Sequence, residues 1–298
     1  MTFSSKVRTV LEMIKFEHSV FALPFALTGA LLAVRESGLE LHALWGKFGW
    51  IVVAMVAARS AAMAFNRVAD AEIDARNQRT KVRAIPAGLV SKSFTWGFIV
   101  FWSVILFAAA YMLNRLCLKL APAALLIVFG YSYTKRFTAL SHLVLGFALG
   151  IAPAAAWIAI RGTLDWPILL LTAGVMLWTA GFDIIYSCQD QEFDRLEGLF
   201  SIPRSMGVRA ALMVARLLHV GMMAMLVWLS QVLDLGYLSL AGIGVVAVLL
   251  AYEHSLVKPQ DLSRVNAAFF TMNGFVSILF FLFWAADILL LTPGGAAT

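Results

Sequence analysis

The sequence predicts an all-α membrane protein with nine transmembrane helices, and three observations support this. Hydrophobic residues make up 61% of the 298 residues, only 13% are charged, and the mean hydropathy is +0.86. A soluble domain has an apolar share of roughly half. The apolar residues also fall in runs of about 18 to 25, the length that a helix needs to cross roughly 30 Å of hydrocarbon.

Nine such runs follow one another along the chain, and none shows the alternation of a barrel strand. Because a backbone in lipid must satisfy its own hydrogen bonds, each run is predicted to be a helix. No linker or soluble segment separates them, so residues 1–298 are predicted to form a single polytopic membrane domain. The predicted spans are 17–34, 44–65, 94–113, 117–133, 140–160, 166–186, 209–231, 236–257 and 266–291.

The distribution of basic residues predicts the orientation of these helices. Of the 23 Lys and Arg residues, 17 lie at the amino end or in or near the loops after the even-numbered spans, five lie in or near the loops on the other side, and Arg59 lies well inside the second span. Loops rich in Lys and Arg stay in the cytoplasm. The amino terminus is therefore expected to face the cytoplasm. The net charge of +6 reflects this topology and does not indicate a nucleic-acid partner.

Two acidic clusters lie at the predicted cytoplasmic ends of the second and sixth spans. Residues four apart share one face of a helix, so each cluster is predicted to form a polar stripe. Both contain Asp-x-Glu-x-Asp followed by Arg and later by Ile-Pro, which suggests two related halves, although a match this short also arises by chance. The clusters are Asn66-x-x-x-Asp70-x-x-x-Asp74 and Tyr186-x-x-x-Asp190-x-x-x-Asp194.

Carboxylates gathered at a membrane face need a compensating charge. Two like charges about 4 Å apart cost roughly 4 kcal/mol at an effective dielectric constant near 20, so the clusters require a divalent metal, bound cations or protonation. Oxygen-rich sites of this kind suit Mg²⁺, with a substrate phosphate completing the coordination. The alternative is that these are ordinary solvated loop charges, but the duplication and the one-face spacing argue against it.

Basic residues follow both clusters and close the fourth span. A metal-bridged diphosphate needs such cations beside the carboxylates, whereas membrane topology alone also accounts for most of them. The residues concerned are Arg76, Arg79, Lys81, Arg83, Lys135, Arg136, Arg195 and Arg204.

Arg59 and Asp183 are charged residues within the predicted spans, and each lies seven positions before a cluster residue. Arg59 precedes Asn66, and because a buried arginine costs at least roughly 2.5–3.5 kcal/mol, a role in lining a cavity is favoured over snorkelling. Asp183 precedes Asp190 and either pairs with a cation or accepts a proton or hydrogen bond from a substrate. The five histidines show no metal or triad spacing and are expected to be caps or core residues.

The two acidic motifs, with Arg59 upstream and Arg83-Ala-Ile-Pro-Ala-Gly88 downstream of the first, resemble the two motifs of the UbiA superfamily of intramembrane prenyltransferases. Tyr131-Ser-Tyr-Thr-Lys135-Arg136-Phe-Thr138 resembles the segment after the fourth helix in the hydroxybenzoate polyprenyltransferase branch. The continuation of the second motif, residues 195–204, is similar to a subgroup linked to menaquinone synthesis by the futalosine route.

The resemblance implies a UbiA-type bundle around a central cavity that opens sideways to lipid. It implies Mg²⁺-dependent transfer of a polyprenyl group from polyprenyl diphosphate to an aromatic acid in ubiquinone or menaquinone biosynthesis, the acceptor being 4-hydroxybenzoate or a futalosine-route naphthoate. In a bacterium, the enzyme would lie in the inner membrane with its active site facing the cytoplasm. A cation-coupled transporter with Arg59 and Asp183 as a relay is the alternative from another class, but the acids cluster at one face instead of the midplane.

The resemblance also assigns roles to individual residues. The expected metal ligands are Asn66, Asp70, Asp74, Asp190 and Asp194. The expected diphosphate-binding residues are Arg59, Lys135, Arg136, Asn66 and Tyr186, and the expected catalytic residues are Asp70, Asp74, Asp190, Asp194 and Asp183.

Overall fold

The computed structural model describes residues 3–13 and 21–291, and this part of the chain is almost entirely helical. The long helices are α2 (Leu23–Ser37), α3 (Trp45–Ala69), α5 (Lys92–Leu113), α6 (Arg115–Thr134), α7 (Ser141–Arg161), α8 (Ile168–Ser187), α10 (Ile202–Val232), α11 (Tyr237–Leu256) and α12 (Asn273–Ala286). The short elements are α1 (Phe3–Met13), η2 (Leu41–Leu44), α4 (Ala71–Arg76), η3 (Cys188–Asp190), α9 (Gln191–Leu196), η4 (Ala267–Met272) and η5 (Asp287–Leu291).

Eight helical segments in the described ranges are long and apolar enough to cross a membrane, in agreement with an integral multi-pass membrane protein. The last eight predicted spans each fall on one of them. The first predicted span begins at residues 17–20, which lie outside the described residues, and continues into α2, which has 15 residues. The exact count of nine spans is therefore not confirmed.

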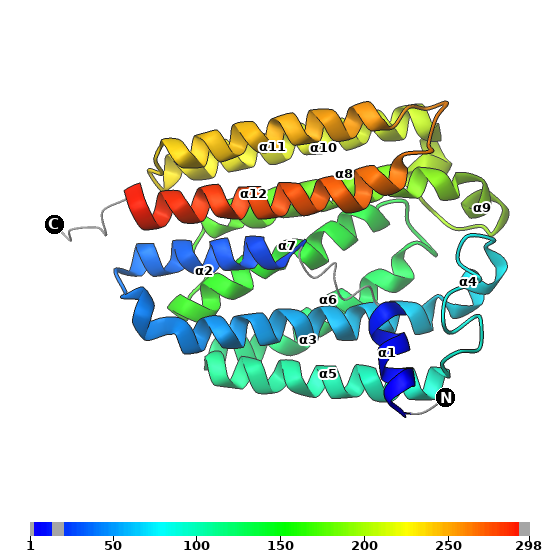
Figure 1. Ribbon diagram of the computed structural model, residues 1–298, viewed down its shortest axis with the longest axis horizontal. Helices are drawn as coiled ribbons and strands as arrows, with labels where there is room; N and C mark the ends of the chain where they lie inside the picture. The colour runs from blue at the N-terminus through cyan, green and yellow to red at the C-terminus, as the bar shows by residue number, and fades with distance from the viewer. Residues whose placement is uncertain (1–2, 14–20, 292–298) are drawn as a thin grey trace.

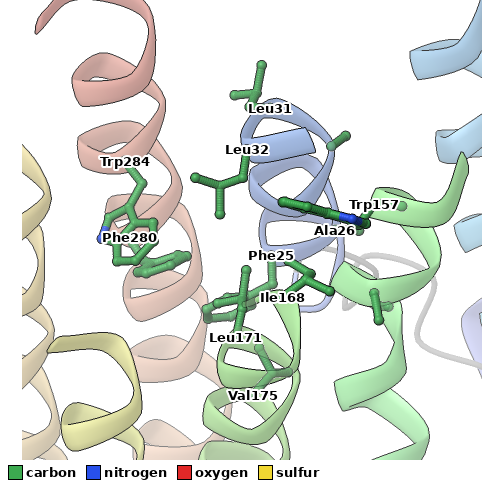
Figure 2. Close-up of a cluster of buried hydrophobic side chains, with 14 of the residues drawn as sticks. Phe25, Ala26, Leu31, Leu32, Trp157, Ile168, Leu171, Val175, Phe280 and Trp284 are labelled. Carbon is green, nitrogen blue, oxygen red and sulfur yellow. The ribbon is translucent and has the colours of Figure 1, made fainter. Parts of the chain in front are cut away.

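Helix α2 lies inside the bundle and forms the centre of its largest apolar core. It packs against α7 and α12, and its Phe25 ring lies 4.8 Å from Phe280 and 5.0 Å from Trp178, centroid to centroid. Figure 2 shows Phe25 and Leu32 of α2 between side chains of α7, α8 and α12, including Trp157 and Trp284. Burial of these large side chains places the short helix firmly within the fold.

Small residues let α7 and α8 approach closely. A Cβ atom added at Gly146 of α7 would collide with the backbone carbonyl oxygen of Met176 in α8, so no larger residue fits there without a shift of the helices. Such small-residue contacts are typical of helix pairs in membranes, where dispersion forces replace the hydrophobic effect. The close approach keeps α8, which carries part of the second acidic cluster, in a defined position.

The long helices run roughly alongside one another, and the short helices α4 and α9 lie close together at one end of the bundle (Figure 1). Each follows a long helix, α4 after α3 and α9 after α8, so the two acidic clusters lie at the same end. Ser201 caps the start of α10 there by accepting a hydrogen bond from the Arg204 backbone N–H. This end of the bundle contains the candidate site.

Candidate active site

The two acidic clusters, 120 positions apart in the sequence, are joined directly in the fold. Asn77 Nδ2 donates a hydrogen bond to Asp190 Oδ1 at 3.2 Å, and Arg79 Nε donates to the same oxygen at 3.1 Å while its Nη2 pairs with Asp190 Oδ2. Beside them, Arg76 Nε lies 2.7 Å from Glu197 Oε2. The loop after the first cluster thus supplies cations to the second.

The helices are interrupted at the clusters, although Asn66 and Asp70 still lie side by side as the predicted polar stripe requires. Helix α3 ends at Ala69 and α4 begins at Ala71, and Asp70 between them has φ −94° and ψ 0°. Asp190 precedes α9 with nearly the same angles, φ −101° and ψ 4°. These values lie in the bridge region, where many active-site residues are found. The matching breaks strengthen the correspondence between the two clusters.

Asp70 is almost fully buried and surrounded by donors. Lys135 Nζ lies 2.6 Å from Asp70 Oδ2, Arg136 Nη2 lies 3.2 Å from Oδ1, and Asn66 Nδ2 donates to Oδ2 at 3.2 Å. A buried carboxylate is costly unless it is paired in this way. The end of α6 therefore brings to Asp70 the two cations that were expected to bind diphosphate.

The other cluster carboxylates are paired as well. Arg83 Nη1 donates to both oxygens of Asp74 at 2.7 Å, and Ser201 Oγ donates to Asp194 Oδ2 at 2.7 Å. Lys135 links the two halves, because its charge also acts on Asp194. In the described ranges, no three His, Cys, Asp or Glu side chains lie close enough together to hold a metal ion.

These residues nevertheless suit a magnesium ion by the chemistry of their donors. Four aspartates and an asparagine can supply oxygen ligands, which Mg²⁺ prefers. All five residues belong to one end of the bundle. Their present partners are mostly Lys and Arg, which are the groups that bind phosphate oxygens. A diphosphate could take over these cations and leave the carboxylates free to bind a metal.

Arg79, which follows α4 outside the predicted spans, is held by both an acid and an aromatic ring. Its Nη1 donates to Tyr186 Oη at 3.0 Å, and its guanidinium lies 5.3 Å from the centre of the Tyr186 ring. Burial lowers the pKa of Arg79, but the hydrogen bond to Asp190 and the charge of that carboxylate outweigh burial and raise it above its ordinary value. Arg79 therefore stays charged at any physiological pH.

Arg59 of α3 and Asp183 of α8, each seven residues before a cluster residue, belong to a second polar layer deeper in the bundle, whereas Arg67 of α3 lies within the first cluster. The Nε atoms of Arg59 and Arg67 on α3 are buried, and neither has a hydrogen-bond partner among the residues that the structure describes. Both arginine charges, and that of Asp183 on α8, act on the hydroxyl group of Tyr131 on α6. Arg59 thus belongs to the polar interior, and its role in lining a cavity stays a prediction.

Asp183 pairs with a histidine that the sequence did not single out. Its Oδ2 lies 2.6 Å from His142 Nδ1. The sequence also did not indicate Asn77, Arg67 or Ser201 as site residues. A serine before Ile-Pro is a signal for a helix start, so the Ser201 cap could have been found. The partners Asn77 and His142 carry no local signal.

An apolar pocket lies elsewhere in the described structure. A cavity of about 370 Å³ lies between α3, α5, α6 and α7, and Ile51, Leu106, Ala124 and Phe147 are among the residues that line it. None of the predicted site residues borders it. The polar layers therefore form a site distinct from this apolar space.

Comparison with known proteins agrees with this arrangement. The family model described as the UbiA prenyltransferase family matches residues 22–290. The 4-hydroxybenzoate octaprenyltransferase of Vibrio cholerae serotype O1 (strain ATCC 39541) is 33% identical over 218 residues, covering 72% of this chain and 75% of its own length. That of Vibrio campbellii is 30% identical over 235 residues, covering 79% and 82%.

Solved structures show the same fold. The apo structure of a UbiA homolog from Aeropyrum pernix K1 has a TM-score of 0.82 and 33% identity, and the match covers 92% of this chain and 99% of that one. A UbiA homolog from Archaeoglobus fulgidus, bound to DMAPP and Mg²⁺, has a TM-score of 0.65 at 17% identity, covering 96% and 100%. With a family match over most of its length, this chain belongs to the UbiA prenyltransferase family.

Proposed function

We propose that this protein transfers a polyprenyl group from polyprenyl diphosphate to a hydroxylated aromatic acid in quinone biosynthesis. The observation that carries the proposal is the meeting of two acidic clusters at one end of the bundle, with Lys or Arg paired to Asp70, Asp74 and Asp190. Such a site can exchange its internal ion pairs for a metal and a diphosphate without gathering uncompensated charge. The named relatives from Vibrio are 4-hydroxybenzoate octaprenyltransferases, which supports this substrate class.

The residues proposed to hold magnesium are Asn66, Asp70, Asp74, Asp190 and Asp194. Bound Mg²⁺ would supply Lewis-acid stabilisation of the departing diphosphate. The Archaeoglobus homolog bound to DMAPP and Mg²⁺ has the same fold, which agrees with a divalent metal here.

The protein's own cations would bind the diphosphate. Lys135 and Arg136, directly after α6, pair with Asp70, and the charge of Lys135 also acts on Asp194. Arg59 lies deeper on α3, and Arg79 bonds to Tyr186 and Asp190. In the reaction, the allylic C–O bond breaks, diphosphate leaves with the electron pair, and a ring carbon of the acceptor forms the new C–C bond before losing its proton. Donors fixed around the leaving group favour this step because they need no reorganisation.

The apolar walls of the bundle would protect the reacting carbon from water. We further propose that α2, with the residues before it, forms a ninth membrane span, since it lies in the core among spanning helices. On this view residues 1–298 form one membrane domain. The excess of Lys and Arg at the end that carries the site supports the proposal that this end faces the cytoplasm, at the inner membrane in a bacterium.

The test is product formation by the purified protein in lipid nanodiscs. Prenyl diphosphate, Mg²⁺ and either 4-hydroxybenzoate or a dihydroxynaphthoate are supplied, and mass spectrometry detects the prenylated acid. The proposal expects a product with one of these acceptors and none when Mg²⁺ is removed with a chelator. Movement of an aromatic acid across the membrane without covalent product would contradict it and favour a transporter.

A further inference from the structure

His142 occupies a fixed orientation in the first turn of α7, where it is nearly fully buried. Its Nε2 accepts a hydrogen bond from the Ile202 backbone N–H at 3.3 Å, and its Nδ1 lies 2.6 Å from Asp183 Oδ2. A backbone N–H can only donate, so Nε2 must be the acceptor and Nδ1 carries the proton. The imidazole therefore donates to Asp183, and the start of α10 determines its tautomer.

This arrangement leaves one oxygen of the Asp183 carboxylate available to accept another hydrogen bond. Within the described ranges, Oδ2 bonds to His142 and Oδ1 has no hydrogen bond, while the side chain is 23% exposed. Asp183 lies seven residues before Asp190 on α8, which corresponds to about 10 Å along a helix. The open oxygen is thus about two turns deeper than the proposed diphosphate site, at the depth of the second polar layer.

The surroundings of Asp183 are polar and come from three helices. The Tyr131 hydroxyl group is close enough to both Asp183 and Arg59 to interact electrostatically with their charges. Arg59 itself has a buried Nε that finds no partner in the described part of the chain. A small aromatic molecule with a hydroxyl group would find a hydrogen-bond acceptor here, about two helical turns below the proposed diphosphate site.

We propose that His142 is a positioning residue, which holds Asp183 so that its free oxygen accepts a hydrogen bond from the hydroxyl group of the aromatic acceptor. The inference rests on the proposed function and adds the group that selects a hydroxylated ring. A hydrogen bond from the hydroxyl group to a carboxylate increases electron density on the ring, which favours attack by the ring carbon. The plain alternative is that His142 only ties α7, α8 and α10 together.

Matched substitutions distinguish the positioning role of His142 from a purely structural role. His142→Gln retains one acceptor for Ile202 N–H and one donor for Asp183, whereas His142→Leu retains the volume and loses both. His42→Gln, in an exposed turn, is the control. A carboxylate–hydroxyl hydrogen bond changes affinity by about 10- to 100-fold, so His142→Leu should lower kcat/KM for 4-hydroxybenzoate by that factor and leave the KM for prenyl diphosphate unchanged.

The selectivity between aromatic acids with and without a hydroxyl group would not change if His142 only held the helices together. Wild-type protein and His142→Gln should bind 4-hydroxybenzoate more tightly than 4-methoxybenzoate in calorimetry without prenyl diphosphate, and His142→Leu and Asp183→Asn should bind both acids equally. Unchanged selectivity in folded His142→Leu or Asp183→Asn would overturn the inference, as would an equal rise in KM for both substrates. If wild-type protein forms no prenylated acid, the proposed function fails, and binding selectivity alone then decides the role of His142.

Discussion

The Arg79 guanidinium, in the loop after α4, forms an ion pair with Asp190, which lies at the break before α9. This contact joins the two halves of the site across 111 residues of sequence. Arg79 also bonds to Tyr186, so its side chain connects an acid, an aromatic ring and the loop that carries Arg83. A diphosphate that enters the site could replace Asp190 as the partner of Arg79.

Arg79→Gln should weaken binding of prenyl diphosphate. The substitution removes a cation that a diphosphate could bind and leaves Asp190 with Asn77 as its remaining donor. We expect the KM for prenyl diphosphate to rise by about 10-fold, the usual effect of one charge-assisted hydrogen bond, with a smaller change in the KM for the aromatic acid. Steady-state kinetics in nanodiscs measures both. An unchanged KM for prenyl diphosphate would place Arg79 outside the binding site.

Asp70→Asn should abolish the response to magnesium. An amide oxygen is a poorer ligand for Mg²⁺ than a carboxylate, and the change also leaves Lys135 without its acid. We expect at least about a 100-fold loss of kcat, which is in the range found when a group that acts on the leaving group is removed. Glu72→Gln is the matched control, because Glu72 lies two residues away, is exposed and, within the described ranges, pairs only with Lys92. Equal effects of the two changes would argue against metal binding by Asp70.

Lys135→Met should reduce both stability and turnover. Asp70 is 2% exposed, and it would keep only Arg136 and Asn66 as partners, so a buried carboxylate would be partly uncompensated. Because the Lys135 side chain is itself 32% exposed, we expect a loss of only about 1–2 kcal/mol of stability. Lys135→Arg preserves the charge and should recover most of the melting temperature. Thermal unfolding in detergent compares the two variants, and equal melting temperatures would refute the pairing argument.

Gly146→Ala should destabilise the bundle although alanine is the better helix former. The added Cβ would overlap the Met176 carbonyl oxygen, and relief requires a shift of α7 against α8. Overpacking of this kind costs about 1–3 kcal/mol. Gly49→Ala is the control, since a Cβ there meets nothing within 4 Å and the change should be neutral or slightly stabilising. The prediction fails if both variants melt at the same temperature.

Asp165 provides a pH-dependent test at the loop between α7 and α8. The Trp157 indole N–H donates to Asp165 Oδ2 at 2.8 Å, and this hydrogen bond, with the nearby Arg161 charge, lowers the pKa of Asp165. A carboxyl group with a depressed pKa stabilises the fold above its unfolded pKa and loses that contribution as the pH falls. Asp165→Asn should therefore have a lower melting temperature than wild type at pH 7. The difference in melting temperature should disappear as the pH falls below about 4. A gap that is constant with pH would contradict this.

Much of this protein follows from its sequence alone. Hydropathy determines which runs become membrane helices, because the length of a span and the absence of charge are local properties. The excess of basic residues predicts one polar face, and the paired Asp-x-x-x-Asp motifs indicate the site. The chain's membership of the UbiA prenyltransferase family agrees with those motifs.

The tertiary structure decided which groups meet. Lys135 lies beside Asp70, Arg79 beside Asp190 and His142 beside Asp183, and these pairs are separated by 65, 111 and 41 positions. No periodicity specifies such contacts, since they depend on how whole helices pack. The helix breaks at Asp70 and Asp190 likewise depend on partners from other elements. Local hydropathy thus produces the helices, and long-range packing turns their polar ends into one site.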